Sequence, residues 1–321
     1  MDILRAIAQI RNPVFDLFFS IITHLGEETL FLAVSIIFFW CVNKREGYYI
    51  LVTGLLGTVI NQFAKLLFRI PRPWVIDPEF KPIESAIPEA TGYSFPSGHT
   101  QNISTTFGSI ASYNCKKRGI VALCVAVIFL VAFSRMYLGV HTLLDVGVSL
   151  VIGLLLVTLL RPVFVSEEKF NKYMPFIAIG SVVLTLAYFV YVMLISDDKT
   201  LDPTNLASGL KNAYTLLGCT IAILPVYFID RKFIRFDTKA PWYAQLLKLV
   251  LGFGGVLLIK SGLSSPLTAL FGNEYVARVV RYFLIVVFAG SIWPLTFKWF
   301  ASMKCEPLDR FGNKVRSFFV R

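Results

Sequence analysis

The chain has 321 residues, of which 56% are hydrophobic and 16% are charged, and its formal net charge at pH 7 is +11. Soluble domains carry about 25% charged residues, so this composition excludes a soluble globular enzyme and indicates an integral membrane protein. The basic residues form no run longer than residues 116–118, so the net charge does not indicate nucleic-acid binding. The five cysteines have no metal-ligand spacing, which argues against a zinc site or a disulfide framework.

The first 26 residues are interrupted by charges and by Asn12-Pro13, and we expect segment 1–26 to lie on the membrane surface as an amphipathic segment. Apolar stretches of about 20 residues, long enough to cross a bilayer, follow along the rest of the chain. We predict about nine membrane-spanning helices, near 28–43, 48–69, 99–115, 119–138, 141–161, 174–195, 208–229, 243–264 and 276–300. The predicted fold is an all-α integral membrane bundle.

Residues 99–115 form the weakest predicted span, because they are rich in Ser, Thr and Asn. Such a helix must face protein or a wet cavity rather than lipid. We assign 27–164 to a catalytic helical core and 165–321 to additional C-terminal membrane helices. The sequence leaves open whether these helices are an appended module or part of one bundle.

Charges alternate between the connecting segments. Basic residues gather near 44–45, 116–118, 161–172, 231–239 and in the C-terminal tail from Lys304 to Arg321, whereas acidic residues gather near 77–89 and 197–202. The positive-inside rule then predicts an N-terminus outside and a C-terminus in the cytoplasm. Arg278 and Arg281 are exceptions, because this scheme puts them near the outer end of the last span.

Three short blocks at the predicted outer face carry ionisable residues that are costly near apolar segments. Lys65, Arg72 and Arg135 supply three cations, and a bound phosphate would compensate them. Gly98, in the block Pro96-Ser97-Gly98-His99, lets the backbone approach an anion. A helix starting near His99 would aim free N–H groups at that anion.

His141 and Asp145 are four residues apart, so they would face each other across one helical turn. A carboxylate behind a histidine fixes its tautomer, which leaves His141 able to attack phosphorus. His99 would protonate the leaving alkoxide. The third histidine, His24, has no partner motif, and we expect it to be an interfacial residue.

The three blocks together, Lys65-x6-Arg72-Pro73, Pro96-Ser97-Gly98-His99 and Ser134-Arg135-x5-His141-x3-Asp145, resemble the signature of the type 2 phosphatidic-acid phosphatase superfamily. The residues around these motifs are most similar to those of sphingosine-1-phosphate phosphatases, and the number of predicted spans is similar to that of glucose-6-phosphatases. The resemblance implies that His141 is a nucleophile forming a phosphohistidine, that Asp145 orients it and that His99 is the general acid. It also implies a phosphate site made by Lys65, Arg72, Ser97, Gly98 and Arg135.

We therefore predict a membrane enzyme that hydrolyses a lipid phosphate monoester or diphosphate at the extracytoplasmic face of a bacterial plasma membrane. No cofactor and no metal are expected, because the cations neutralise the phosphate charge. The expected partners are a phosphorylated lipid and the bilayer, and not nucleic acid. Two alternatives stay open: a phosphotransferase with a lipid diphosphate donor, and a catalytically silent phosphate-lipid binder or transporter. The sequence names neither the lipid nor the oligomeric state.

Overall fold

The computed structural model describes residues 1–308 and 310, and every regular element in them is helical. The basic tail residues beyond 310, used above for the topology, lie outside the described residues. The helices are α1 (Asp2–Ala8), α2 (Pro13–Thr23), α3 (Glu28–Ile37), α4 (Lys44–Phe68), α5 (Pro73–Ile76), α6 (Gly98–Tyr113), α7 (Arg118–Tyr137), α8 (Leu143–Val165), α9 (Glu167–Leu194), α10 (Pro203–Ile229), α11 (Trp242–Gly262), α12 (Ser264–Phe271), α13 (Glu274–Val287) and α14 (Phe297–Ser302).

Each of the nine predicted spans overlaps one helix or, for 28–43 and 276–300, a run of consecutive helical segments. In the described residues, seven helices are long and apolar enough to cross a membrane, and an eighth span is counted if two bent segments, 13–26 and 28–42, form one span. The structure thus supports a multi-span helical membrane protein, and the count of nine stays a prediction. The difference lies mainly in α6, which has only 16 residues and buries polar side chains along most of its length.

The N-terminal segment is divided into two helices. Asn12 accepts hydrogen bonds from the backbone N–H groups of Val14 and Phe15 and so begins α2, with Pro13 at its first position. α2 packs along α7, and its axis meets that of the following helical segment at 55°. Residues 13–26 can therefore belong to a broken span rather than to a surface segment, and the surface location of 1–26 stays untested.

Two helix ends determine where functional side chains lie. α4 ends at Phe68, followed by Arg69 in the left-handed conformation, so Lys65 lies in the last turn and Arg72 in the loop beyond. The predicted span 48–69 therefore ends within one residue of the end of α4. At α8, Thr142 and Asp145 form a reciprocal capping box, so the helix begins at Leu143. The prediction that His141 belongs to this helix is wrong, because Thr142 is the cap.

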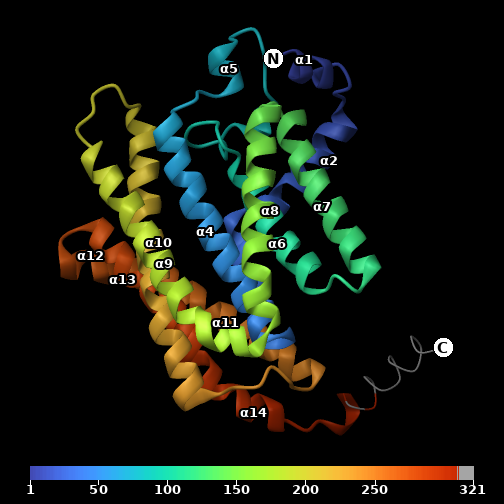
Figure 1. Cartoon of the computed structure of the whole chain (residues 1–321), viewed down its shortest axis with the longest axis vertical. Helices are drawn as coiled ribbons and strands as arrows, with labels where there is room; N and C mark the ends of the chain where they lie inside the picture. The colour runs from blue at the N-terminus through green and yellow to red at the C-terminus, as the bar shows by residue number, and fades with distance from the viewer. Residues whose placement is uncertain (309, 311–321) are drawn as a thin grey trace.

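The C-terminal helices belong to the same bundle as the core. α9 and α10 pack against α4, as the ribbon shows (Figure 1). The Tyr188 hydroxyl donates to the Gly209 carbonyl at 3.0 Å, and the Tyr191 hydroxyl donates to the Leu66 carbonyl at 3.3 Å. Gly209 allows this approach, because a Cβ there would lie 2.6 Å from a Leu66 methyl group. One buried apolar cluster accordingly contains side chains from both halves of the chain.

The two ends of the bundle carry different charges. The N-terminus, α5 and the α9–α10 connection lie at one end, and α14 lies at the other (Figure 1). At the first end, Arg5 pairs with Asp77 at 2.7 Å, and Arg69 pairs with Asp198 at 2.8 Å. At the opposite end of α4, about 36 Å away at 1.5 Å per residue, Lys44 pairs with Asp230, the residue that follows α10. The acidic loops thus gather at one end.

Candidate active site

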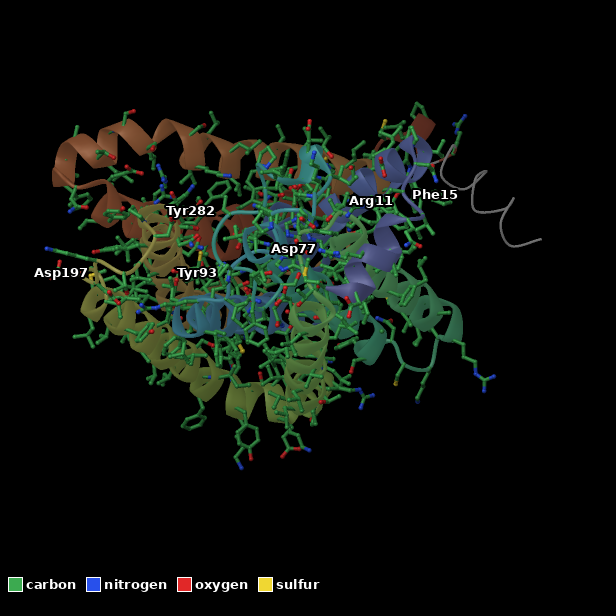
Figure 2. The ribbon with its side chains drawn as sticks, turned by 90° about the horizontal axis from the view of Figure 1, so that it is seen from above. Arg11, Phe15, Asp77, Tyr93, Asp197 and Tyr282 are labelled. Carbon is green, nitrogen blue, oxygen red and sulfur yellow. The ribbon has the colours of Figure 1, made fainter. Side chains whose placement is uncertain are left out.

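A cavity of about 670 Å³ lies near the end of the bundle that carries the acidic loops, and residues from both halves of the chain line it. Tyr93, in the loop before α6, and Tyr282, on α13, both line it, and Figure 2 labels them between Asp197 and Asp77 in the view from above. Six of the eight predicted site residues line this cavity: Lys65, Arg72, Gly98, His99, Arg135 and His141. The other two, Ser97 and Asp145, lie behind them.

His141 lies between a guanidinium and a carboxylate. Its Nε2 is 2.9 Å from an Arg72 nitrogen, and its Nδ1 is 3.5 Å from Asp145 Oδ2. Arg72 can only donate, so Nε2 is the acceptor and the ring proton resides on Nδ1, toward Asp145. The predicted His141–Asp145 proximity is present, although it arises from the turn before α8 and not from a helical repeat.

The turn that carries His141 depends on Gly139, whose φ is +78°. A Cβ at this position would lie 2.8 Å from a Phe80 ring carbon. The backbone N–H groups of Val140 and His141 both donate to the Arg135 carbonyl, at 3.1 and 3.3 Å. The turn therefore folds back onto the end of α7 and aims the imidazole into the cavity.

Arg72 connects two loops as well as facing His141. Its guanidinium donates to the carbonyls of Thr91 at 2.8 Å, Gly92 at 3.0 Å and Val140 at 3.0 Å. The Lys65 ammonium donates to the carbonyl of Tyr93 in the same loop. Both cations are buried, so the loop before α6 is held against α4 by charged groups that also line the cavity.

Arg135 is only 1% exposed, and its Nη1 donates to the Thr23 hydroxyl at 2.5 Å. Its Nε has no hydrogen-bond partner among the described residues. A buried donor without a partner is costly, and an anion in the cavity would satisfy it. Among the described residues, His99 Nε2 is likewise buried and has no hydrogen-bond partner. Two unpaired nitrogens beside three cations thus suit an oxyanion ligand.

The first turn of α6 supplies the remaining predicted groups. Gly98 lines the cavity, and an added Cβ would meet only an Asn61 oxygen at 3.7 Å, so no protein atom fills the space beside it. Ser97 does not face the cavity, because its hydroxyl accepts hydrogen bonds from the backbone and side chain of Thr100. The Ser97 side chain therefore caps α6, and the N-terminus of that helix points toward the cavity.

Burial, then the charges of Arg72, Arg135 and Lys65, hold the pKa of His141 well below its ordinary value of 6.5. The imidazole is accordingly neutral at pH 7, with a lone pair on the side that faces Arg72. A neutral, oriented imidazole beside clustered cations is suited to nucleophilic attack on a phosphoryl group.

Three contacts of the site were absent from the sequence-based predictions. Ser94 donates to Asp145 at 2.6 Å and lies 3.4 Å from His141 Nδ1, so it completes the orientation of the ring. Thr23 pairs with Arg135, as described above. Gly26 packs on His99, since a Cβ there would lie 2.9 Å from the His99 Cβ. Only Ser94 had a signal, its place two residues before Pro96-Ser97-Gly98-His99.

His24 lies close to two carboxylates. Its Nδ1 is 2.5 Å from Glu27 and 3.5 Å from Glu89, and in the described residues this is the one group of three side chains whose ligand atoms lie close enough to share a metal ion. Both glutamates line the cavity. The ring is half exposed, which agrees with an interfacial position, and the group by itself does not indicate a metal site.

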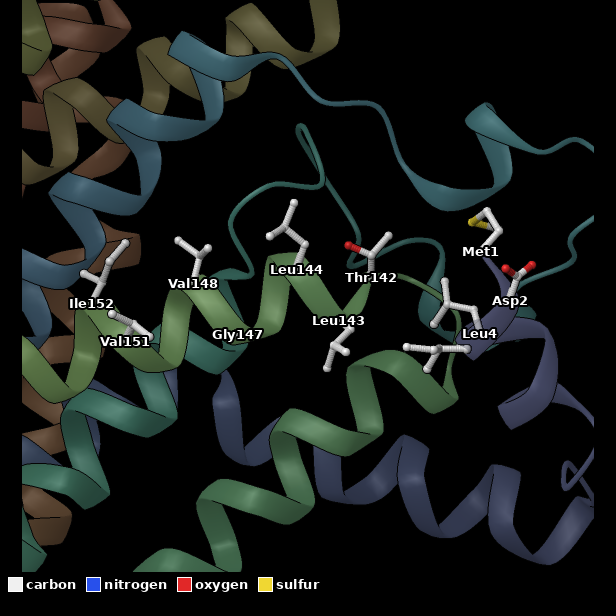
Figure 3. Close-up of a pocket in the computed structure, with 11 residues that line it drawn as sticks. Met1, Asp2, Leu4, Thr142, Leu143, Leu144, Gly147, Val148, Val151 and Ile152 are labelled. Atoms are coloured by element: carbon white, nitrogen blue, oxygen red, sulfur yellow. The ribbon is translucent and has the colours of Figure 1, made fainter.

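A second hollow of about 690 Å³ lies beside the segment that follows His141 (Figure 3). It separates α1 from the first half of α8, and apolar side chains dominate its lining. In this hollow the only side chain with a formal charge is that of Asp2. The hollow therefore suits hydrocarbon rather than a phosphate group.

Comparisons with known proteins match much of the chain to one family. Residues 46–169 match the family model described as the PAP2 superfamily, and residues 214–304 match the one described as the PAP2 superfamily phosphatase, transmembrane extension. The chain is 29% identical over 182 residues to phosphatidylglycerophosphatase B of Bacillus subtilis, covering 53% of this chain and 84% of that protein. It is 26% identical over 183 residues to sphingosine-1-phosphate phosphatase 2 of Mus musculus.

The matches cover the relatives unevenly. The mouse alignment covers 54% of this chain and 50% of that protein, so the chain spans about half the length of that relative. Among solved structures, a transmembrane PAP2-type phosphatidylglycerolphosphate phosphatase from Bacillus subtilis shares 30% sequence identity. That match has a TM-score of 0.43 and covers 50% of this chain and 82% of the other.

Proposed function

This chain belongs to the PAP2 superfamily of membrane phosphatases, and from that premise we propose that it hydrolyses a lipid phosphate monoester or diphosphate through a covalent phosphohistidine. The observation that carries the proposal is the position of His141 between Arg72 and Asp145. That position supports a neutral ring with its Nε2 lone pair on the cation side, where a phosphate would lie.

In the first proposed step, Nε2 of His141 attacks phosphorus, and the bond from phosphorus to the leaving oxygen breaks. His99, protonated once the anionic substrate occupies the cavity, donates that proton to the leaving oxygen, and the leaving group departs as an alcohol or a phosphate. The ring proton on Nδ1 stays with His141 and is stabilised by Asp145 as the ring gains charge. The buried and unpartnered Nε2 of His99 supports this role.

In the second step, water attacks the phosphohistidine and gives its proton to the now neutral His99, while the bond from phosphorus to Nε2 breaks. Inorganic phosphate leaves, and both histidines return to their starting states. Lys65, Arg72 and Arg135 would stabilise the charge on the equatorial oxygens in both steps, with the first turn of α6 at Gly98 as a further donor. The proposal needs no metal and no cofactor, because these cations provide the neutralisation.

We also propose that the site faces the extracytoplasmic side of the membrane, which in a bacterium is the outside of the plasma membrane. The acidic loops at the same end as the cavity and the basic turn between α6 and α7 at the other end support this orientation through the positive-inside rule.

The decisive test is phosphate release from a panel of lipid monoesters and diphosphates, in EDTA, by wild type, His141→Ala and His24→Ala. We expect His141→Ala to lose turnover and His24→Ala, the matched histidine control, to keep it. Equal rates for wild type and His141→Ala would overturn the proposal. Transfer of the phosphoryl group to an added acceptor instead of water would indicate a phosphotransferase.

A further inference from the structure

The catalytic cavity has a second wall that the proposed chemistry does not use. Eight residues of α10 line it, and six of them are polar: Thr204, Asn205, Ser208, Lys211, Asn212 and Thr215. Their spacing of three and four residues puts them on one face of the helix. A polar face on a membrane helix is costly next to lipid, so it indicates a water-filled or ligand-filled space.

Arg278, one of the two arginines that the topology did not explain, completes this wall. It lies on α13, is 9% exposed and lines the cavity. One terminal nitrogen donates to Glu274 at 2.9 Å, whereas the buried Nε has no partner in residues 1–308 and 310. Glu274 is largely exposed, so water screens that ion pair. The inner side of the guanidinium is therefore available to a ligand in the cavity.

The ionisable groups on this side of the cavity are mainly cationic. Lys211 lines the wall, and both Lys211 and Lys260 are near enough to Glu28 to interact electrostatically with it. Within the described residues, neither lysine forms an ion pair at 4.0 Å or less. With Arg278, these three cations outnumber the two nearby carboxylates, Glu28 and Glu274, and this excess favours an anionic ligand group.

The cavity is larger than the scissile phosphate requires. A phosphate group has five heavy atoms and occupies on the order of 150 Å³ if each takes the volume of a water molecule, about 30 Å³. The cavity measures about 670 Å³. The remaining space is bordered by amides and hydroxyls of α10, which suit a hydroxylated spacer better than hydrocarbon.

We propose that Lys211, Arg278 and the polar face of α10 form a second anion subsite, which binds a charged group of the substrate beyond the scissile phosphate. The inference rests on the proposed phosphatase function and names the substrate class: a lipid whose terminal phosphate monoester is joined through a short polar spacer to a second, uncleaved phosphate. The C-terminal helices thereby select the headgroup, while the core performs the chemistry.

The test compares phosphatidylglycerophosphate, which has the spacer and the second phosphate, with phosphatidate of the same acyl chains, which has neither. Arg278→Gln and Lys211→Gln should each reduce kcat/KM for the first lipid by about tenfold, the effect of one lost charge-assisted hydrogen bond, and leave phosphatidate within twofold. Arg278→Lys should restore part of the loss. Lys199→Gln, which removes a loop charge outside the cavity lining, is the control.

Equal losses on both lipids, or no loss on either, would overturn the subsite. Thermal unfolding of each variant separates a binding defect from a folding defect, and Lys211, which is exposed to the cavity, gives a second variant if Arg278→Gln fails to fold. If wild type hydrolyses neither these two lipids nor any other member of the panel of monoesters and diphosphates, the phosphatase proposal is wrong. Equilibrium binding of the two lipids to wild type and Lys211→Gln then still decides whether the subsite prefers the second phosphate.

Discussion

Replacing Asp145 by Asn removes a buried negative charge and keeps the volume of the side chain. Asp145 is 1% exposed, and its Oδ2 accepts from the Ser94 hydroxyl at 2.6 Å and from the Thr142 N–H at 2.7 Å. Hydrogen bonds to charged groups contribute about 1.5–3 kcal/mol and neutral ones about 0.5–1.5 kcal/mol. Neutralising the acceptor of both bonds should therefore reduce the free energy of unfolding by about 2–3 kcal/mol.

The effect on catalysis should be larger than the effect on stability. In Ser-His-Asp triads the same change reduces kcat by about 10⁴, because the histidine adopts the wrong tautomer. Here Nδ1 of His141 is 3.5 Å from Oδ2, a looser contact than a direct hydrogen bond, so we expect a reduction on the order of 10³, or about 4 kcal/mol of barrier. The loss should fall on kcat, because Asp145 does not line the cavity.

The assay is rapid-quench measurement of phosphoenzyme formation from a radiolabelled lipid phosphate. Ser94→Ala, which removes one hydrogen bond and keeps the charge, should slow that step far less than Asp145→Asn. His141→Ala should form no phosphoenzyme. If Asp145→Asn formed the phosphoenzyme within threefold of the wild-type rate, the assignment of Asp145 as the group that orients His141 would be refuted.

Three further predictions concern pH, backbone conformation and metal. Burial and the nearby cations lower the pKa of His141, so His141 stays neutral as pH falls from 7, and the acid limb of kcat/KM should lie below pH 6.5. Because the unfolded chain binds this proton more readily than the folded one, His141 should also make the free energy of unfolding fall as pH drops below 6.5. An acid limb above pH 7 would contradict this. Gly139→Ala should lower the unfolding free energy by about 1–3 kcal/mol, because a non-glycine residue at φ +78° is strained and its Cβ meets Phe80. Gly147→Ala is the control, because a Cβ there has no atom within 4 Å. Equal melting temperatures for the two variants would refute the prediction. Phosphate release should be unchanged by EDTA, since the three buried cations neutralise the phosphate, and a loss restored by Mg²⁺ would show otherwise.

Much of the fold could be read locally. Apolar length predicted the helices, because a membrane helix satisfies its own backbone hydrogen bonds within one segment. The predicted helix ends were less accurate where a capping residue determines the end of the helix. The α8 start is the clearest case, since the Thr142–Asp145 capping box excludes His141 from the helix that its spacing with Asp145 suggested.

Only the residues of the candidate site that belong to short motifs could be predicted from the sequence. Side chain types and spacing brought Lys65, Arg72, His99, Arg135 and His141 to one predicted face, and the structure places all five around one cavity. The role of each stays a proposal. Ser97 was assigned to the phosphate site by resemblance, yet its hydroxyl caps a helix, a distinction that depends on a hydrogen bond and not on a motif.

The sequence by itself determined that this chain is a helical membrane protein and predicted a phosphate-binding motif set, because apolar length and cation spacing act over a few residues. Only the tertiary structure decided what surrounds that set. Thr23 meets Arg135 across 112 residues, and Arg278 reaches the same cavity as Lys65 from the far end of the chain. Such contacts depend on how helices pack, which no local pattern encodes, and they make Arg278, which the topology did not explain, part of a wall of the cavity.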